Sequence, residues 1–290
     1  MIQLTDVTKR YDNTTVVDGL NLQINTGEIV GIIGHNGAGK STTLKMIVGL
    51  IEPTSGDVRV MGRNIHTEGV RVKQQIGYLP EDSPLYEAMT ARQYLMFFSE
   101  LYRMPREKAL KRIDQLLDSL DLAEKDKLTG EFSKGMKRKT AIARALLHDP
   151  DLLVLDEPNS GLDPLTSFFI INYLKTLKSE GKTIILSAHN LFHVESICDR
   201  VGIIKNGRLL IFDTMETIRA KLGQREYQVI FKADQKLDYE MIEGNYVFRA
   251  AEVEAISIIL EMISANKWTL VDLSMKESAL EEIYVKLMTN

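Results

Sequence analysis

The sequence predicts an α/β fold, in which an antiparallel β subdomain, a largely parallel sheet and a helical insert precede a small α+β C-terminal domain. Three observations carry this prediction. The apolar run 29–33 precedes a glycine-rich turn and a helical pattern over 42–50, which indicates a strand, a loop and a helix. Strands and helices alternate with short links from 151 to 204, which is typical of a parallel sheet. Between 84 and 128 strand signals disappear and apolar residues recur at helical spacing.

The segments before the glycine-rich turn predict antiparallel strands, because residues 2–7 and 16–25 alternate apolar and polar side chains. Tyr11 lies at a turn between them. After the first helix, Pro53 and Gly56 break the chain. Further strands are expected at 57–61, 76–79, 151–155, 183–187 and 201–204, with helices over 164–178 and 191–198.

Two domains are expected, one over 1–222 with a helical subdomain at about 84–150, and an accessory domain over 223–290. A helix over 215–222 leads to Gly223-Gln224, a plausible boundary. The tail then carries new strand signals at 227–231, 246–248 and 268–273, and a helix around 253–263. Ser274 and Glu277 fit a capping box that opens a last helix over 277–288. We expect this small α+β domain to be separable and either regulatory or dimer-supporting.

Composition narrows the function classes. The chain has 290 residues and a formal net charge of -4. Residues 223–290 hold 7 basic against 12 acidic side chains, so the acidic excess lies in the tail and no basic footprint for nucleic acid is present. A single cysteine, Cys198, excludes an internal disulfide and is expected to be buried. No signal peptide or membrane-spanning run is evident, which predicts a soluble chain.

The glycine-rich turn reads Gly34-His35-Asn36-Gly37-Ala38-Gly39-Lys40-Ser41 and fits the phosphate-binding P-loop pattern. Its backbone N–H groups can converge on phosphate oxygens, and the following helix adds the positive end of its dipole. Lys40 is expected to reach the β- and γ-phosphates of a nucleotide and to assist catalysis, while the Ser41 hydroxyl ligates Mg2+. The loop residues and Thr42 are candidate nucleotide-binding residues. The alternative is a plain glycine-rich turn.

Two carboxylates end the apolar run 152–155. Asp156 is expected to reach the Mg2+ held by Ser41, and Glu157 to polarise the attacking water. The alternative is a pair of solvated carboxylates at a strand end. An apolar strand ending in Asp-Glu after a P-loop favours the catalytic interpretation.

Residues 130–139, Gly-Glu-Phe-Ser-Lys-Gly-Met-Lys-Arg-Lys, lie just before a predicted helix. With the motifs above, they make the chain resemble the ATP-binding cassette (ABC) ATPases, which share a P-loop NTPase core. Ser133 and Gly135 match the family's Leu-Ser-Gly-Gly-Gln signature, whereas Phe132, Lys134 and Met136 depart from it. Ser-Lys-Gly-Met-Lys looks like the signature of drug, polymer and antibiotic-resistance exporters. A Ser hydroxyl and Gly N–H groups at a helix N-terminus form an anion site.

The resemblance implies roles for other residues. Tyr11 is expected to stack on adenine, with a packed strand-edge Tyr as the alternative. Asp163, after Ser160-Gly161-Leu162, is expected at a dimer interface, and His189 at the γ-phosphate. Glu81 stands where the family usually has Gln, and a contact linked to Mg2+ is expected there; the alternative is a solvated loop carboxylate.

The resemblance further implies an ATPase that uses ATP and Mg2+ and energises a separate integral membrane permease, with export as the expected direction. In the family arrangement each signature serves the facing subunit, which implies a homodimer or a paralogous heterodimer at the cytoplasmic face of the membrane. Residues 278–284 look like the C-terminal extension of some exporter ATPases.

Four alternative functions are less consistent with the sequence. The basic run at Lys134, Lys137, Arg138 and Lys139 lacks interleaved aromatic residues, which disfavours nucleic acid. His189 and His193 are spaced i, i+4 but have no nearby third or fourth zinc ligand. A soluble ABC protein of DNA repair or ribosome regulation usually carries a coiled-coil insertion or two cassettes, which are not seen. A P-loop kinase would not need the signature.

Overall fold

The computed structural model describes residues 1–124 and 127–289, and its contacts divide the chain into two compact units, Met1–Thr214 and Met215–Asn290. The helix expected over 215–222 belongs to the second unit rather than to the first, because it packs against the last helix of the chain. Two residues of the helical insert, 125 and 126, and residue 290 of the tail lie outside the described residues.

A six-stranded sheet forms the centre of the first unit, in the order β10-β9-β3-β8-β7-β6. Five of its strands run parallel, and β10 pairs antiparallel with β9. Strands β3, β7 and β8 are buried along their whole length, as their continuous apolar sequences predict. The strands are β3 (Ile29–Ile33), β6 (Ile76–Leu79), β7 (Leu152–Leu155), β8 (Thr183–Ser187), β9 (Arg200–Lys205) and β10 (Arg208–Thr214).

A second, antiparallel sheet in the order β2-β1-β4-β5 shares a core with the parallel sheet. Helix α1 (Lys40–Ile47) contributes Leu44, Met46 and Ile47 to this common core and contacts both β2 and β4. The glycine-rich turn therefore lies between two elements that are fixed in the core, β3 before it and α1 after it. The strands are β1 (Ile2–Tyr11), β2 (Thr14–Ile24), β4 (Ser55–Val60) and β5 (Arg63–Asn64), and the short helix α2 (Gly69–Lys73) precedes β6.

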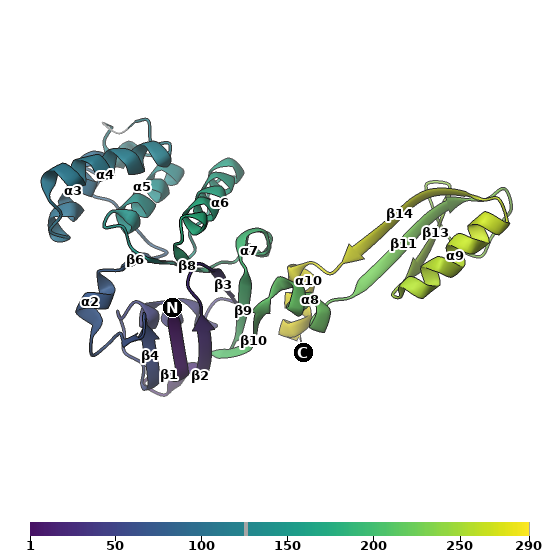
Figure 1. Cartoon of the computed structure of the whole chain (residues 1–290), viewed down its shortest axis with the longest axis horizontal. Helices are drawn as coiled ribbons and strands as arrows, with labels where there is room; N and C mark the ends of the chain where they lie inside the picture. The colour runs from purple at the N-terminus through teal and green to yellow at the C-terminus, as the bar shows by residue number, and fades with distance from the viewer. Residues whose placement is uncertain (125–126, 290) are drawn as a thin grey trace. The chain divides into compact units, whose positions relative to one another are not determined.

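Helices occupy the chain between β6 and β7, where strand signals are absent from the sequence. Helices α3, α4 and α5 pack on one another, and α5 also packs on β6 (Figure 1). Helices α6 and α7 lie against the parallel sheet and contact β8 and β3. Their bounds are α3 (Ala91–Leu101), α4 (Arg106–Ser119), the 3-10 turn Thr129–Glu131, α5 (Lys134–Leu146), α6 (Pro164–Ser179) and α7 (Leu191–Ile197).

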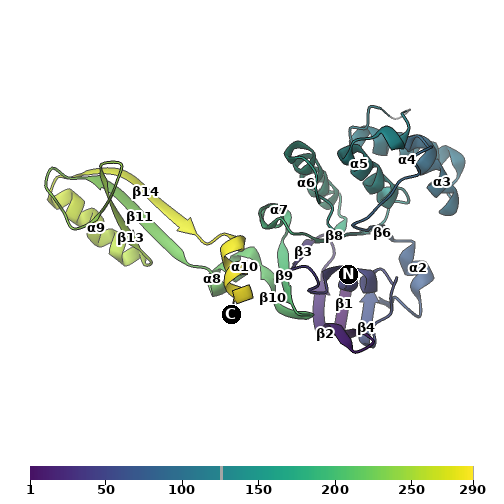
Figure 2. The same ribbon diagram turned by 180° about the vertical axis from the view of Figure 1, so that it is seen from behind.

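The second unit is an antiparallel sheet in the order β12-β13-β11-β14, with α9 covering one face (Figure 2). Phe231 lies at the centre of its core, fully buried among the rings of Tyr239, Tyr246 and Trp268. Helices α8 and α10 pack on each other. The elements are α8 (Met215–Leu222), β11 (Arg225–Lys232), β12 (Glu240–Ile242), β13 (Asn245–Ala250), α9 (Val253–Ala265), β14 (Thr269–Glu277) and α10 (Leu280–Thr289).

The expected capping box at Ser274 and Glu277 is wrong. Both residues lie in β14, where Ser274 pairs with Gln228 and Glu277 with Arg225, and α10 begins only at Leu280. The strand continues past the end expected at 273 because its backbone keeps pairing with β11 as far as Glu277. These strand pairs outweigh the local preference of the sequence for a helix start. A capping box does occur at Thr90 and Gln93, at the start of α3. Strand β10 was not predicted from the sequence.

A chain ending at Thr214 is predicted to fold and to bind ATP, because the first unit has its own core and ends at a unit boundary. The measurement is thermal melting with and without nucleotide, compared with the full chain. A truncated chain that is insoluble, or that melts without nucleotide protection, would make residues 215–290 part of the catalytic fold.

Candidate nucleotide-binding site

The carboxyl ends of three neighbouring parallel strands place the candidate residues together. Strand β3 leads into the glycine-rich turn, β7 into Asp156 and Glu157, and β8 into Ala188 and His189. Because β3 pairs with β8 and β8 with β7, all in parallel, their ends meet at one edge of the sheet. Ligand sites of open α/β sheets lie at this edge.

The turn between β3 and α1 needs its glycines. Gly37 and Gly39 have φ angles of 80° and 106°, in the left-handed region that side chains disfavour. A Cβ atom at Gly34 would lie 2.4 Å from the carbonyl oxygen of Ile204. Within this turn the Lys40 Nζ donates to the carbonyl oxygens of Gly34 at 2.7 Å and His35 at 3.2 Å. Burial lowers the pKa of Lys40, while the carboxylates of Glu157, Asp156 and Glu81 act to raise it.

Asp156 is the centre of a small hydrogen-bond network. The Ser41 hydroxyl donates to Asp156 Oδ1 at 3.1 Å, and the Ser187 hydroxyl donates to the same oxygen at 2.5 Å. Ser187 Oγ also accepts the backbone N–H of Glu157 at 2.9 Å. Ser187 therefore ties the end of β8 to the end of β7, orienting the Asp156 carboxylate and holding the backbone of Glu157. Ser187 is not among the site residues predicted from the sequence.

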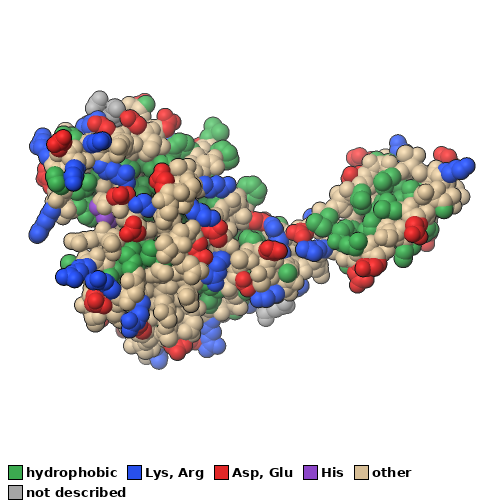
Figure 3. Space-filling view, viewed as in Figure 1, with side chains coloured by type: hydrophobic (Ala, Val, Ile, Leu, Met, Phe, Trp, Pro, Cys, Tyr) green, Lys and Arg blue, Asp and Glu red, His purple; other side chains and the backbone are tan. Residues whose placement is uncertain are grey.

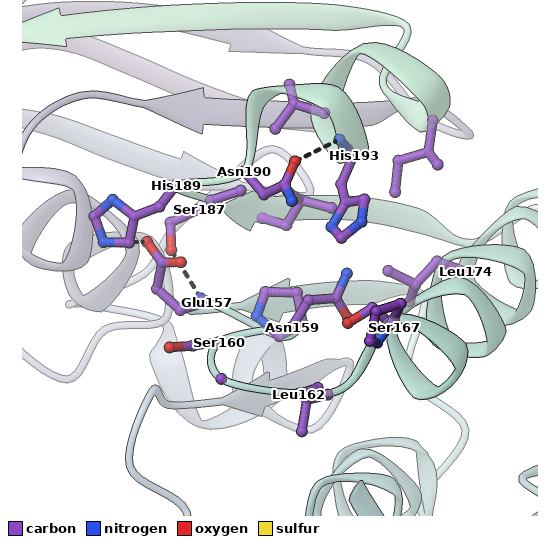
Figure 4. A pocket seen from close by; sticks show the side chains of 17 residues that line it. Glu157, Asn159, Ser160, Leu162, Ser167, Leu174, Ser187, His189, Asn190 and His193 are labelled. Carbon is purple, nitrogen blue, oxygen red and sulfur yellow. Dashed lines mark hydrogen bonds and ion pairs between the residues drawn. The ribbon is translucent and has the colours of Figure 1, made fainter.

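Glu157 is buried and strained. Its side chain is almost inaccessible, and its φ of 50° is left-handed, which costs a non-glycine residue energy and is concentrated at functional sites. His189 Nε2 lies 3.0 Å from Glu157 Oε1, as Figure 4 shows. Burial raises the pKa of Glu157 to about 7; Lys40 opposes this shift, and Asp156 and Glu81 add to it. Burial likewise lowers the pKa of His189, with Lys40 acting in the same direction.

Glu81 follows β6 and lines the same cavity, and a residue missed at the sequence level holds its loop. Arg138, on α5, is buried and donates to the carbonyl oxygens of Pro80 at 3.3 Å and Glu81 at 3.0 Å. At the sequence level Arg138 was considered only as part of a basic run weighed for nucleic-acid binding, and only the packing of α5 on β6 brings it to this loop. Arg138 also brings a positive charge toward a loop that carries Glu81 and Asp82.

A cavity of about 360 Å³ collects most of the candidate residues. Gly34, His35, Asp156 and Tyr11 do not line it; Tyr11 ends β1 with its ring partly exposed and the Lys9 ammonium 5.0 Å from the ring centre. Val16, which the sequence analysis missed, also contributes to the lining. The lining residues are Val16, Asn36, Gly37, Ala38, Gly39, Lys40, Ser41, Thr42, Glu81, Glu157 and His189.

A second pocket lies on the other side of Glu157 and His189, between the 159–162 loop, α6 and α7 (Figure 4). His189 and His193 both line this second pocket, but His189 precedes α7, so the two histidines do not share a helix face. Among residues 1–124 and 127–289, no group of three or more His, Cys, Asp or Glu side chains is arranged to hold a metal ion.

The residues resembling a signature lie apart from this cavity. Ser133 caps the N-terminus of α5, its hydroxyl accepting the N–H of Met136 at 3.2 Å. A Cβ atom at Gly135 would lie 3.0 Å from Thr166 on α6. Asp163 caps α6 and accepts from Thr166 N at 2.9 Å; hydrogen bonding from the Thr166 side chain, and then from its backbone, lowers the pKa of Asp163. Neither Ser133 nor Gly135 lines the cavity of the glycine-rich turn.

A glycine-rich loop between a central parallel strand and a helix, with Lys and Ser at the start of that helix and Asp at the end of another strand, defines a P-loop nucleotide-binding protein. The family model for "ABC transporter" matches residues 17–160. The chain belongs to the ATP-binding subunits of ABC transporters, a family of ATP-hydrolysing cassettes, as its relatives below also indicate.

Three curated relatives are similar over most of their length. The linearmycin resistance ATP-binding protein LnrL of Bacillus subtilis is 40% identical, covering 77% of this chain and 72% of the relative. The bacitracin transport ATP-binding protein BcrA of Bacillus licheniformis is 35% identical, covering 99% and 97%. The ATP-binding protein NatA of Bacillus subtilis is 38% identical, covering 80% and 96%.

Solved structures agree with the fold. An ATP-binding subunit of an ABC transporter aligns with a TM-score of 0.70 at 34% identity, covering 76% of this chain and 92% of the other. A dimeric ATP-binding cassette bound to ADP and phosphate aligns with a TM-score of 0.69 at 29% identity, covering 74% and 99%. No helix in the described part of this chain is both long and apolar enough to span a membrane.

The raised pKa of Glu157 predicts a pH-dependent stability difference. In the nucleotide-free protein, ionised Glu157 is disfavoured by folding, so its unfavourable contribution grows as pH rises from about 4.5 to about 7 and then levels off. Glu157→Gln lacks this titration. We expect the free energy of unfolding of Glu157→Gln to increase relative to that of wild type by roughly 1–3 kcal/mol between pH 5 and pH 8. The measurement is the melting temperature of both proteins as a function of pH. A pH-independent difference would mean that Glu157 titrates normally.

Proposed function

We propose that this chain binds ATP with Mg2+ and hydrolyses it as one of two ATPase subunits that drive a separate integral membrane permease. The observation that carries this proposal is that Lys40, Ser41 and Glu157 line one cavity beside the glycine-rich turn, with Asp156 behind them as the hydrogen-bond acceptor of the Ser41 hydroxyl. The proposed location is the cytoplasmic face of a membrane, with attachment through the permease.

Mg2+ fits the oxygen atoms available beside the turn. The Ser41 hydroxyl and the Asp156 carboxylate already lie 3.1 Å apart, and both are hard oxygen donors of the kind that Mg2+ prefers. Glu81, on the same cavity, is a third candidate. When bound, Mg2+ neutralises charge that develops on the β- and γ-phosphate oxygens.

The protein's own groups account for nucleotide binding. Lys40 now donates to carbonyl oxygens of Gly34 and His35, and phosphate oxygens are better acceptors for the same ammonium. The backbone N–H groups of the turn and the N-terminus of α1 add further donors. Tyr11 presents an exposed ring on which adenine can stack.

Glu157 has the properties of a general base. Its pKa of about 7 lies near the working pH. A carboxylate with such a pKa is partly ionised at that pH and still binds a proton strongly. Burial lowers the pKa of His189, and its Nε2 lies 3.0 Å from Glu157 Oε1, close enough to orient the carboxylate. The proton of the attacking water passes to Glu157, and His189 also approaches the γ-phosphate.

Two subunits complete the site. Ser133 and Gly135 do not line the cavity of their own chain, so we propose that they bind the γ-phosphate on a second subunit, identical or paralogous. A dimeric arrangement is recorded for a similar cassette. Since relatives are named for linearmycin resistance, bacitracin transport and Nod factor export, we propose export as the direction, with an amphipathic natural product as the class of cargo.

Glu157→Gln is predicted to bind ATP and to turn over at least about 100-fold more slowly, the usual effect of removing a general base. ATP-bound dimers should accumulate, as measured by light scattering alongside steady-state ATPase rates. Glu180→Gln, an exposed glutamate beyond α6, serves as the matched control. Near-normal turnover in Glu157→Gln would transfer the role to another residue, His189 first.

Glu81 and Arg138, which holds the Glu81 loop, are expected to affect Mg2+ binding together. Glu81→Ala is predicted to need more Mg2+ for half-maximal hydrolysis, whereas Glu81→Gln binds metal-free ATP equally well or slightly more tightly, since it removes a charge near the γ-phosphate. Arg138→Gln should shift the Mg2+ titration in the same direction as Glu81→Ala. The double variant Glu81→Ala with Arg138→Gln should need little more Mg2+ than Glu81→Ala alone, because Arg138 acts through the Glu81 loop.

Arg138→Lys is the matched control, because it keeps the charge but not the planar fork that reaches two carbonyl oxygens. Melting curves exclude general unfolding. Superimposable Mg2+ titrations for wild type and the Glu81 variants would mean that Glu81 never contacts the metal.

A further inference from the structure

Strand β14 is a long open edge of the C-terminal sheet. The sheet has the order β12-β13-β11-β14, so β14 pairs with β11 on one side and with no other described strand on its outer side. From Asp272 to Glu277 the pairing with β11 is regular; the one shift in register lies nearer the start of β14. The outward backbone groups of this segment are therefore available to another strand.

The helix-side face of β14 is apolar and uncovered. Leu270, Leu273 and Met275 pair with Phe231, Val229 and Tyr227 of β11 and so point to the α9 side of the sheet. Val229 and Phe231 are fully buried, whereas the three β14 side chains are 45–52% exposed. Figure 3 shows apolar side chains gathered over this unit. An exposed apolar row on an open edge favours pairing with a further strand.

The opposite face of β14 is self-complementary in charge. It carries Asp272, Ser274 and Lys276 at alternate positions. If a second copy of β14 lies antiparallel with the two Ser274 residues opposite each other, Asp272 of each copy faces Lys276 of the other. Leu273 then faces Met275 of the second copy on the apolar side. Edge strands are often protected by charged side chains that repel the same strand of a second copy. In this register Asp272 and Lys276 instead attract their counterparts on the second copy.

We propose that β14 pairs antiparallel with β14 of a second copy of this chain, in a register centred on Ser274. The contact is isologous, because each strand supplies the same surface and the twofold axis passes between the two serines. It joins two four-stranded sheets edge to edge, as in strand addition to an open sheet.

This contact is weaker than a stable dimer interface. One strand pair of this length buries less than the roughly 800 Å² per partner of a standard complex. Its effect is to keep two chains near each other when ATP does not hold the catalytic units together, which raises their effective concentration for the next closure. That role rests on the proposed ATP-driven dimer, whereas the strand pairing itself does not.

Cysteine cross-linking of the full chain without nucleotide tests the pairing and its register. The native Cys198 is buried, so wild type supplies a low background. Ser274→Cys is expected to form disulfide-linked dimers under mild oxidation at least roughly tenfold faster than Ser257→Cys, an exposed site on α9. Asp272→Cys alone should cross-link slowly, but rapidly when mixed with Lys276→Cys.

Charge reversal gives a second, independent measurement. Asp272→Lys or Lys276→Asp should weaken self-association roughly tenfold in sedimentation experiments, and the double reversal should restore it. Equal cross-linking of Ser274→Cys and Ser257→Cys would overturn the proposal, as would association that ignores charge reversal. Because no nucleotide is present, these results are independent of the turnover of Glu157→Gln, which tests the ATPase proposal.

Discussion

The site depends on keeping several charges together at the buried edge of a parallel sheet. Asp156 and Glu157 are adjacent and nearly inaccessible, and Lys40 is buried close to them. Burying carboxylates is costly unless partners compensate, and here Lys40, Ser41, Ser187 and His189 do so. Burial still dominates for Glu157, whose pKa rises even with an ammonium nearby. The hydrogen-bond network around Asp156 therefore positions the groups and also allows two acids to share one small volume.

Much of this arrangement could be predicted from the sequence, because the chemistry is local. Continuous apolar runs gave β3, β7 and β8, and the glycines, Lys40 and Ser41 follow directly on β3. Asp156 ends a buried strand of the predicted sheet and was expected beside the turn for that reason, whereas His189 was expected there from the family resemblance. The roles assigned to Tyr11, Glu81, Ser133 and Gly135 remain predictions.

The remaining features depend on contacts between distant segments. The local pattern at Ser274 resembles a helix start, but the ladder with β11 makes it a strand. Helix α8 reads as the end of the first domain, yet α10, more than fifty residues later, determines the unit to which it belongs. Ser187 and Arg138 acquire their contacts only when β8 lies beside β7 and α5 packs on β6. Periodicity within a short window contains no information about such neighbours.

Arg138 has a mechanical consequence. Its two hydrogen bonds end on main-chain carbonyl oxygens of Pro80 and Glu81, which neither titrate nor exchange ligands. The link between α5 and the loop after β6 therefore does not depend on the protonation of its acceptor groups. We expect a displacement of α5 to be passed to the Glu81 loop, and a displacement of that loop to be passed to α5. One side chain thus couples two segments that are more than fifty residues apart in the sequence.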